Sequence, residues 1–223
     1  MKLTYPEINA VLDTENGKIN SIVIENAELM YNFLSDINFQ ILGNDGRTVI
    51  SDSKGTVDFA KSVELISQFI PFELSKKSLI SKITSVMEKR AVAEDLYLET
   101  AELLSVFEKY LDKLSYEVDC DIIWEKVNIN SLIKAAGIML NEEYESLSEK
   151  ILDYFELVRE FERNKMFITV NLRSYISDNE LELFLSDALK RNINLIMIEN
   201  HEHKLLNNEK RLVIDSDLCE IEL

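Results

Sequence analysis

Two apolar runs flank an amphipathic segment in the last third of the chain. The runs Met166–Leu172 and Asn194–Glu199 do not alternate apolar with polar residues, which is typical of strands buried on both faces. Between them, Ser177 and Glu180 have capping-box spacing at the start of a helical pattern. Because a helical crossover of this length joins parallel neighbours, the pattern predicts a β-α-β unit in a parallel or mixed sheet.

The remainder of that predicted sheet comes from both ends of the chain. Asn26 can cap a helix over Ala27–Asp36, whose apolar residues give one partly buried face. Short strands are predicted at Leu3–Tyr5, Ala10–Asp13, Ser21–Glu25, Thr48–Ser51, Val63–Phe69, Arg211–Asp215 and Leu218–Ile221.

The middle of the chain has a helical pattern. From Ser75 to about Tyr116 there is no Gly or Pro, and apolar residues recur at helical spacing. As one straight helix this segment would measure about 60 Å, so it must project or fold back as a hairpin. A second helix, Ser146–Arg163, is paired with it, and a short helix at Asn130–Ala136 ends at Gly137.

These patterns predict an α/β fold with two parts. Residues 1–74 and 164–223 are expected to form an α/β head with a mixed, partly parallel sheet. Residues 75–163 are expected to form a mainly helical leg domain.

Composition narrows the class of protein. The chain has 223 residues, of which 46% are hydrophobic and 29% charged, as in soluble globular proteins. There is no secretory signal pattern, and no apolar run approaches the roughly 20 residues that a membrane span needs. Cys120 and Cys219 form no Cys-x-x-Cys pair, which indicates a reduced compartment. Together with the lack of a signal pattern and of a membrane span, this predicts a cytoplasmic protein with no membrane partner.

Several kinds of catalytic or binding site have little support. Gly17-Lys18 is followed by Ile19 where a Walker phosphate loop needs Ser or Thr, and no Gly-x-Gly-x-x-Gly is present. His201 and His203 could bind zinc, but no Cys or further His lies near them in the sequence, so a solvated loop is favoured. No Ser/His/Asp grouping or pair of carboxylates is singled out by spacing. The sequence therefore predicts no catalytic residues.

An acidic segment follows the long helical pattern. Glu117, Asp119, Asp121 and Glu125 lie within nine residues, and crowded carboxylates repel one another unless a cation such as Ca²⁺ lies among them. The segment lacks the EF-hand spacing. A metal site and a solvated acidic turn both remain open on this pattern.

A basic segment opens the same helical pattern. Its cations are Lys76, Lys77, Lys82, Lys89 and Arg90. Lys82 and Lys89 are seven residues apart and share a helix face. A solvated helix explains this pattern, as does a stripe that faces phosphates. The net charge of −17 argues against nucleic acid if it is evenly spread, but the charge here is segregated.

An ordered set of segments resembles the short form of a CRISPR-associated family. These segments are Leu12–Lys18, Ile22–Glu25, Phe33-Leu34, Ser131–Ile138, Phe167–Asn171, Tyr175–Glu180 and Asn194–Glu199. They are similar to the type II-A spacer-acquisition (adaptation) proteins of the Csn-two family. The resemblance covers most of the chain and is loose between Gly43 and Tyr116.

The resemblance implies a degenerate P-loop-NTPase-like head that lacks its phosphate loop and carries a projecting helical leg. It also implies a homotetrameric ring that threads double-stranded DNA, prefers DNA ends and is held by Ca²⁺. Glu117, Asp119, Asp121 and Glu125 fall on the family's acidic cluster, although Lys126, Asn128 and Asn130 follow where relatives often carry more acids. The implied partners are the integrase complex and the effector nuclease of the same antiviral defence system.

A ring accommodates the negative charge, since acids can face outward while a few cations repeated fourfold line the hole. The candidate DNA-binding residues are Lys76, Lys77, Lys82, Lys89, Arg90 and Lys134. Contacts to phosphates alone make binding independent of sequence and sensitive to salt. The leading hypothesis is a non-enzymatic DNA-end-binding ring protein of CRISPR adaptation. The alternative is an acidic protein–protein adaptor that has a dead nucleotide-binding fold and no DNA contact.

Overall fold

The computed structural model describes residues 1–15, 17–162 and 165–223. The chain forms two compact units. Unit 1 comprises Met1–Phe72 and Glu143–Leu223, and unit 2 comprises Glu73–Glu142. The predicted boundary between residues 163 and 164 lies outside the described residues.

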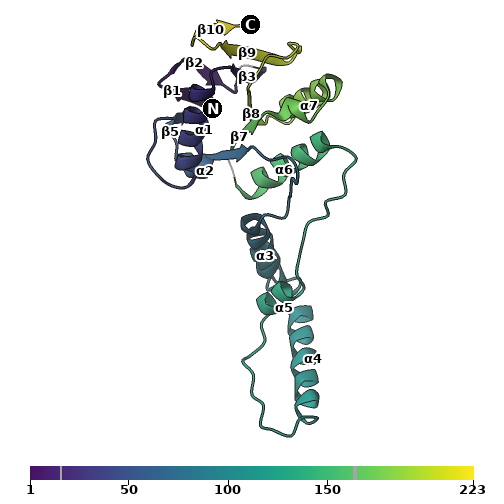
Figure 1. Cartoon of the computed structure of the whole chain (residues 1–223). Helices are drawn as coiled ribbons and strands as arrows, with labels where there is room; N and C mark the ends of the chain where they lie inside the picture. The colour runs from purple at the N-terminus through teal and green to yellow at the C-terminus, as the bar shows by residue number, and fades with distance from the viewer. Residues whose placement is uncertain (16, 163–164) are drawn as a thin grey trace. The chain divides into compact units, whose positions relative to one another are not determined.

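The large sheet of unit 1 confirms the predicted α/β class and the β-α-β unit (Figure 1). Its strand order is β10-β9-β3-β8-β7-β6. The five strands from β9 to the edge strand β6 are parallel, and β10 is antiparallel to β9. The strands are β3 (Ile19–Ile24), β6 (Val63–Ile66), β7 (Met166–Val170), β8 (Asn194–Glu199), β9 (Glu209–Ile214) and β10 (Glu220–Glu222). The parallel pair β7 and β8 is joined by η1 (Leu172–Ser174) and α7 (Asp178–Lys190).

One face of this sheet is covered by an apolar layer. Ile22, Ile168 and Ile198 on the sheet belong to one buried cluster with Phe33 of α1 and Ile50 of β4. Asn26 caps α1 by accepting the N–H of Leu29 at 3.0 Å, as predicted. The layer is formed by α1 (Ala27–Ile41), α2 (Phe59–Ser62) and a second, antiparallel sheet of β1 (Lys2–Tyr5), β2 (Ile8–Asp13), β4 (Val49–Asp52) and β5 (Gly55–Thr56).

The opposite face is covered by α7 and by α6 (Leu147–Phe161). Phe155 of α6 packs on Phe167 of β7, with 4.1 Å between ring centroids, and also contacts Phe184 of α7. The pairing of α6 with the long helix in a leg is therefore wrong, because its apolar face is satisfied by the sheet of unit 1. Its predicted end at Arg163 lies outside the described residues.

The expected capping box of α7 is half formed. Ser177 Oγ accepts the N–H of Glu180. The Glu180 carboxylate does not return to the backbone of Ser177, because it accepts the hydroxyl of Ser148 on α6 at 2.6 Å. Glu180 thus joins the two helices on this face.

Unit 2 contains α3 (Lys77–Ala91), α4 (Tyr97–Ser115) and α5 (Ile129–Ala135). The helical pattern predicted from Ser75 to about Tyr116 is interrupted between Val92 and Leu96, although no Gly or Pro lies there. The break is stabilised by the Thr100 hydroxyl, which donates to the Ala91 carbonyl at 2.7 Å, and by an Arg90–Asp95 ion pair. Figure 1 shows α4 continuing beyond α3, so the two do not form a hairpin.

The two ends of unit 2 are tied together. The Glu142 carboxylate accepts the N–H groups of Leu74 and Ser75, each at 3.0 Å. Ser75 Oγ in turn accepts the N–H of Leu140 at 3.1 Å.

Within the described part of the chain, no helix is long and apolar enough to cross a membrane.

Candidate nucleic-acid interface

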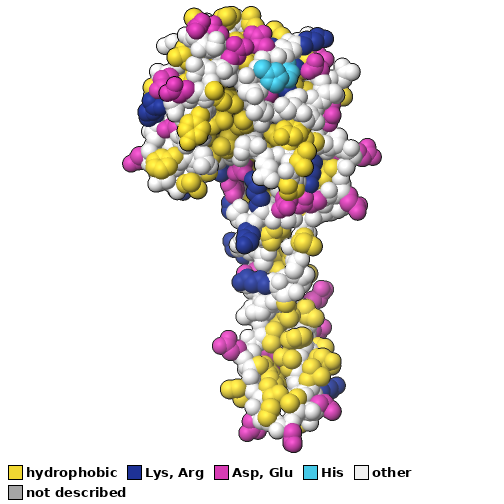
Figure 2. Space-filling model, viewed as in Figure 1, with side chains coloured by type: hydrophobic (Ala, Val, Ile, Leu, Met, Phe, Trp, Pro, Cys, Tyr) yellow, Lys and Arg dark blue, Asp and Glu magenta, His cyan; other side chains and the backbone are white. Residues whose placement is uncertain are grey.

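The predicted DNA-binding residues lie on two helices of unit 2, and the structure divides them. Lys77 on α3 and Lys134 on α5 line one groove. Lys76 lies at the N-cap of α3, and Lys82 and Lys89 lie on α3 outside the lining of this groove. Arg90 is held by Asp95 at 2.7 Å. Figure 2 shows Lys and Arg side chains around α3, whereas hydrophobic side chains cover α4 and the segment after it.

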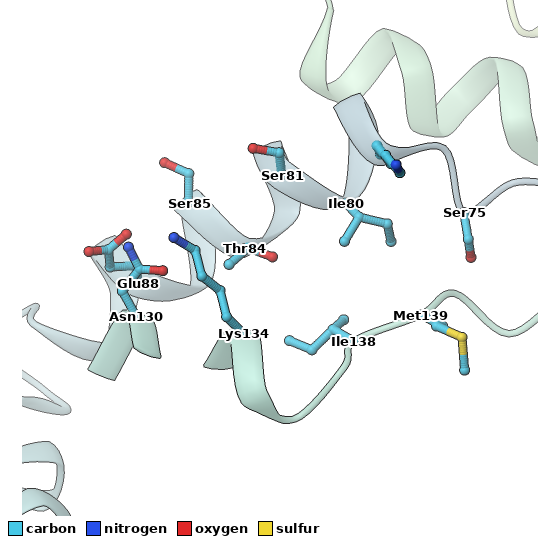
Figure 3. A pocket seen from close by; sticks show the side chains of 11 residues that line it. Ser75, Ile80, Ser81, Thr84, Ser85, Glu88, Asn130, Lys134, Ile138 and Met139 are labelled. Atoms are coloured by element: carbon cyan, nitrogen blue, oxygen red, sulfur yellow. The ribbon is translucent and has the colours of Figure 1, made fainter. Parts of the chain in front are cut away.

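The groove between α3 and α5 has a volume of about 510 Å³ and lies entirely within unit 2 (Figure 3). One helical face of α3 forms its first wall, since the lining positions recur at three- and four-residue intervals. These α3 residues are Lys77, Ile80, Ser81, Thr84, Ser85 and Glu88.

The second wall of the groove begins at the short helix α5. Asn128 caps α5 by accepting the N–H of Ser131 at 2.9 Å. After the helix, Gly137 has φ of +63°, a left-handed conformation that favours glycine and that the Gly137 prediction anticipated. This turn lets Ile138 and Met139 line the same groove as Asn130 and Lys134.

The charge of the groove is weakly positive. Lys77 and Lys134 make no ion pair within the described residues, and Glu88 is the acidic residue among the lining side chains. Asn130 Oδ1 is buried and accepts no hydrogen bond within the described residues. The groove therefore offers two cations, hydroxyl groups and one unused amide acceptor to a ligand.

The predicted metal-binding acids do not come together. Glu117, Asp119, Asp121 and Glu125 are all exposed on the segment between α4 and α5, most of which has no regular structure. Among the described residues, no group of three or more His, Cys, Asp and Glu side chains could hold a metal ion. These acids therefore do not fit a calcium site within one chain.

The two histidines adjoin a buried charged cluster in unit 1. Their rings lie 4.2 Å apart between centroids. Burial and the nearby Arg173 guanidinium lower the pKa of His203. Arg211 donates to the His203 carbonyl and pairs with Glu209 at 2.8 Å.

The same cluster contains a second arginine and an unusual carboxyl group. Arg173 reaches Glu209 at 3.3 Å and Asp178 at 2.7 Å. Its backbone N–H donates to Glu199 Oε1, while Glu199 Oε2 has no donor within the described residues. Burial raises the pKa of Glu199 to about 7; Arg173 opposes this shift and Glu209 adds to it.

Sequence reasoning missed this cluster of Arg173, Glu199, Glu209 and Arg211. A signal was present, because Arg211 begins a predicted strand and Glu199 ends a run predicted as a buried strand. A charged residue there requires a partner. The cluster fixes the loop between β8 and β9, since both arginines also donate to the Lys204 carbonyl.

The connection from β3 to α1 bears on nucleotide binding. β3 ends at Ile24 and α1 begins at Ala27, so Glu25 and Asn26 alone join them. A Walker loop places its Gly-rich segment between such a strand and helix. Two residues cannot form that loop.

The family model described as "CRISPR-associated protein (Cas_Csn2)" matches residues 40–218. The match spans unit 2 and most of unit 1.

Proposed function

The chain belongs to the Cas_Csn2 family of CRISPR-associated proteins, and on that premise we propose that it is a non-enzymatic ring protein that binds double-stranded DNA ends during spacer acquisition. The observation that carries DNA binding is the groove of unit 2, which is lined by Lys77 and Lys134 from distant parts of the sequence, neither of them ion-paired within the described residues. Cations of this kind attract phosphates whatever the base sequence.

We base the proposal that the protein is not an enzyme on the structure of unit 1, the α/β head. The strand order of five parallel strands supports a degenerate nucleotide-binding fold, and the two-residue β3–α1 connection supports the loss of phosphate binding. In this proposal the head serves as a rigid support, while unit 2 contacts DNA. The further partners are copies of the same chain in a homotetramer, the integrase complex and the effector nuclease.

The form of the DNA tests the proposal. We expect linear duplex to bind and a covalently closed circle of the same sequence not to bind, since a ring must be threaded from an end. A mobility-shift titration with both forms measures this. Equal affinity for the two forms would contradict end threading.

Two lysine substitutions test the location of the interface. The double variant Lys77→Ala with Lys134→Ala is expected to weaken linear-duplex binding and to reduce the slope of log affinity against log salt by about 2 for each subunit that contacts the DNA. Lys54→Ala, at an exposed position of unit 1, is the control for loss of a cation. An unchanged slope in the double variant would move the interface away from this groove.

Calcium is proposed as a cofactor of the assembly. Because the four acids do not converge within one chain, a second copy has to supply the missing ligands. We expect the molar mass in solution to fall when Ca²⁺ is replaced by a chelator. Asp119→Asn with Asp121→Asn should give the low mass even with Ca²⁺. The same mass under all conditions would refute this role.

A protein–protein adaptor is the second candidate function. It is favoured by the exposed apolar side chains of α4, including Leu98, Val106 and Tyr110 at 74%, 64% and 56% exposure, since large exposed apolar patches mark interaction sites. A complete lack of DNA binding with Ca²⁺ present would favour this candidate over the first.

A further inference from the structure

The groove between α3 and α5 is sized for a small ligand. Its volume of about 510 Å³ falls within the roughly 300–1,000 Å³ of small-molecule sites. A single nucleotide fits in such a space, whereas a double helix does not. Any DNA that fills the groove must therefore present one nucleotide outside its base pair.

The lining of the groove is divided into parts that match those of a nucleotide. Ile80 and Ile138 face one another across the groove in Figure 3, and Met139 lies beyond them. These side chains offer an apolar surface for the flat faces of a base. Lys134 extends from α5 toward α3, beside Thr84, and supplies a hydrogen-bond donor between this apolar pair and the far end of the groove. Lys77, one helical turn before Ile80, supplies a cation for a phosphate.

The end of the groove opposite Met139 offers hydrogen-bond acceptors. Glu88 of α3 and Asn130 of α5 both line the groove, and their side chains appear at this same end in the view of Figure 3. The carboxylate only accepts hydrogen bonds, and the buried Asn130 Oδ1 has no donor within the described residues. A ligand that brings adjacent N–H donors to this end would satisfy both groups.

We propose that this groove holds one unpaired nucleotide at the end of a DNA strand, and that it prefers guanine to thymine. The base lies between Ile80 and Ile138, the phosphate lies near Lys77, and the base edge points past Lys134 toward Glu88 and Asn130. Guanine presents N1–H and an N2 amino group side by side, whereas thymine has one N–H between two carbonyl acceptors. This inference rests on the proposed function, because it needs DNA to reach unit 2.

An unpaired strand end is the form of DNA that suits this site best. Extruding a base from the middle of a duplex requires its pairing and stacking to be broken, and that cost is least for a nucleotide that is already single-stranded. A protein that engages ends through this groove would distinguish an overhanging nucleotide from a blunt end.

The test compares duplexes that share one sequence and differ in their ends. The intact protein is titrated with a blunt duplex and with duplexes that carry a single-nucleotide overhang of guanine or thymine, using fluorescence anisotropy with Ca²⁺ present. We expect the guanine overhang to bind about tenfold more tightly than the blunt duplex, and the thymine overhang to lie between them.

Two variants without loss of a cation locate the effect. Asn130→Ala should abolish the advantage of the overhang over the blunt duplex, because it removes the unused amide acceptor and leaves the cap of α5 at Asn128 in place. Glu88→Gln should bring the guanine-to-thymine affinity ratio close to one, since an amide can both donate and accept. Ser131→Ala, whose side chain does not line the groove, is the matched control.

A cross-linking measurement gives a second test. An overhang of 6-thioguanine should cross-link on irradiation to the peptide that contains residues 129–139. Equal binding of blunt and overhanging duplexes, or a cross-link only to unit 1, would overturn the groove assignment while DNA binding stands. Failure of every duplex to bind would overturn the proposed function together with this inference.

Discussion

The helices α6 and α4 have similar apolar periodicity and opposite environments. α6 in unit 1 buries one face, including Ile151, Phe155 and Val158. α4 in unit 2 is longer, yet it has no buried residue. The difference shows that periodicity reveals whether a helix has an apolar face, but not what covers that face.

The ends of the helices differ in the same way. In unit 1 the helices α1, α2, α6 and α7 begin at side chains that accept a backbone N–H, namely Asn26, Asp58, Ser146 and Ser177. In unit 2, α3 and α4 begin at Lys76 and Leu96 without such a bond. The helices of unit 1 therefore have both a capped start and a buried face, whereas the long helices α3 and α4 of unit 2 lack a side-chain cap and bury little of their surface.

The largest expected effect tests the contrast in burial directly. Phe155→Ala should lower the free energy of unfolding by about 3–5 kcal/mol, because it leaves a cavity against Phe167 and Phe184. Leu103→Ala on α4, where the side chain is 52% exposed, should change it by less than about 0.5 kcal/mol. Urea unfolding of both variants measures this. Similar losses would show that the α4 surface is buried in solution.

A smaller effect depends on the buried Glu199. Its pKa of about 7 exceeds the usual 4.5, so between about pH 4.5 and pH 7 the folded state keeps a proton that the unfolded state releases. The contribution of this group to stability is complete below about pH 4.5 and is lost as pH rises through 7, a loss of about 3 kcal/mol. Glu199→Gln should lack this component of the pH dependence.

Unfolding free energies measured at pH 5 and pH 8 test that prediction. The difference between variant and wild type should shift in favour of the variant at pH 8. Glu202→Gln, at an exposed position of the same loop, controls for loss of a carboxylate. A constant difference across this range would mean that Glu199 titrates normally.

The smallest effect concerns a helix cap. Ser177→Ala removes the acceptor for the N–H of Glu180 and should cost about 1 kcal/mol of stability. Ser53→Ala at an exposed turn should leave thermal unfolding unchanged. A cap effect no larger than the control would imply that burial alone positions α7.

The sequence predicts the elements that have an apolar run or a helix start or end signal within their own residues. β7, α7 and β8 were found because buried parallel strands leave continuous apolar runs, and Asn26 and Gly137 mark a helix start and a helix end. The break between α3 and α4 was missed because it is made by Thr100 and by the Arg90–Asp95 pair, neither of which is a typical breaking signal.

The sequence identifies some residues of the candidate site, but it does not predict that they line one groove. Lys77 and Lys134 were both identified. They line the same groove only because the segment between α4 and α5 returns the chain to α3. That segment has no periodic pattern from which its path could be inferred. Asn130 and Glu88 had no distinguishing sequence signal, and their relevance comes from proximity in the fold.

The hydrogen bonds that the N–H groups of Leu74 and Ser75 donate to Glu142 have a consequence for the engineering of this protein. Since the chain enters and leaves unit 2 at the same point, the whole segment resembles a cassette inserted into a loop of an otherwise continuous α/β framework. A short Gly/Ser bridge from Phe72 to Glu143 should splice that framework back together. Cassettes of other lengths could be exchanged at the same junction without rebuilding the sheet.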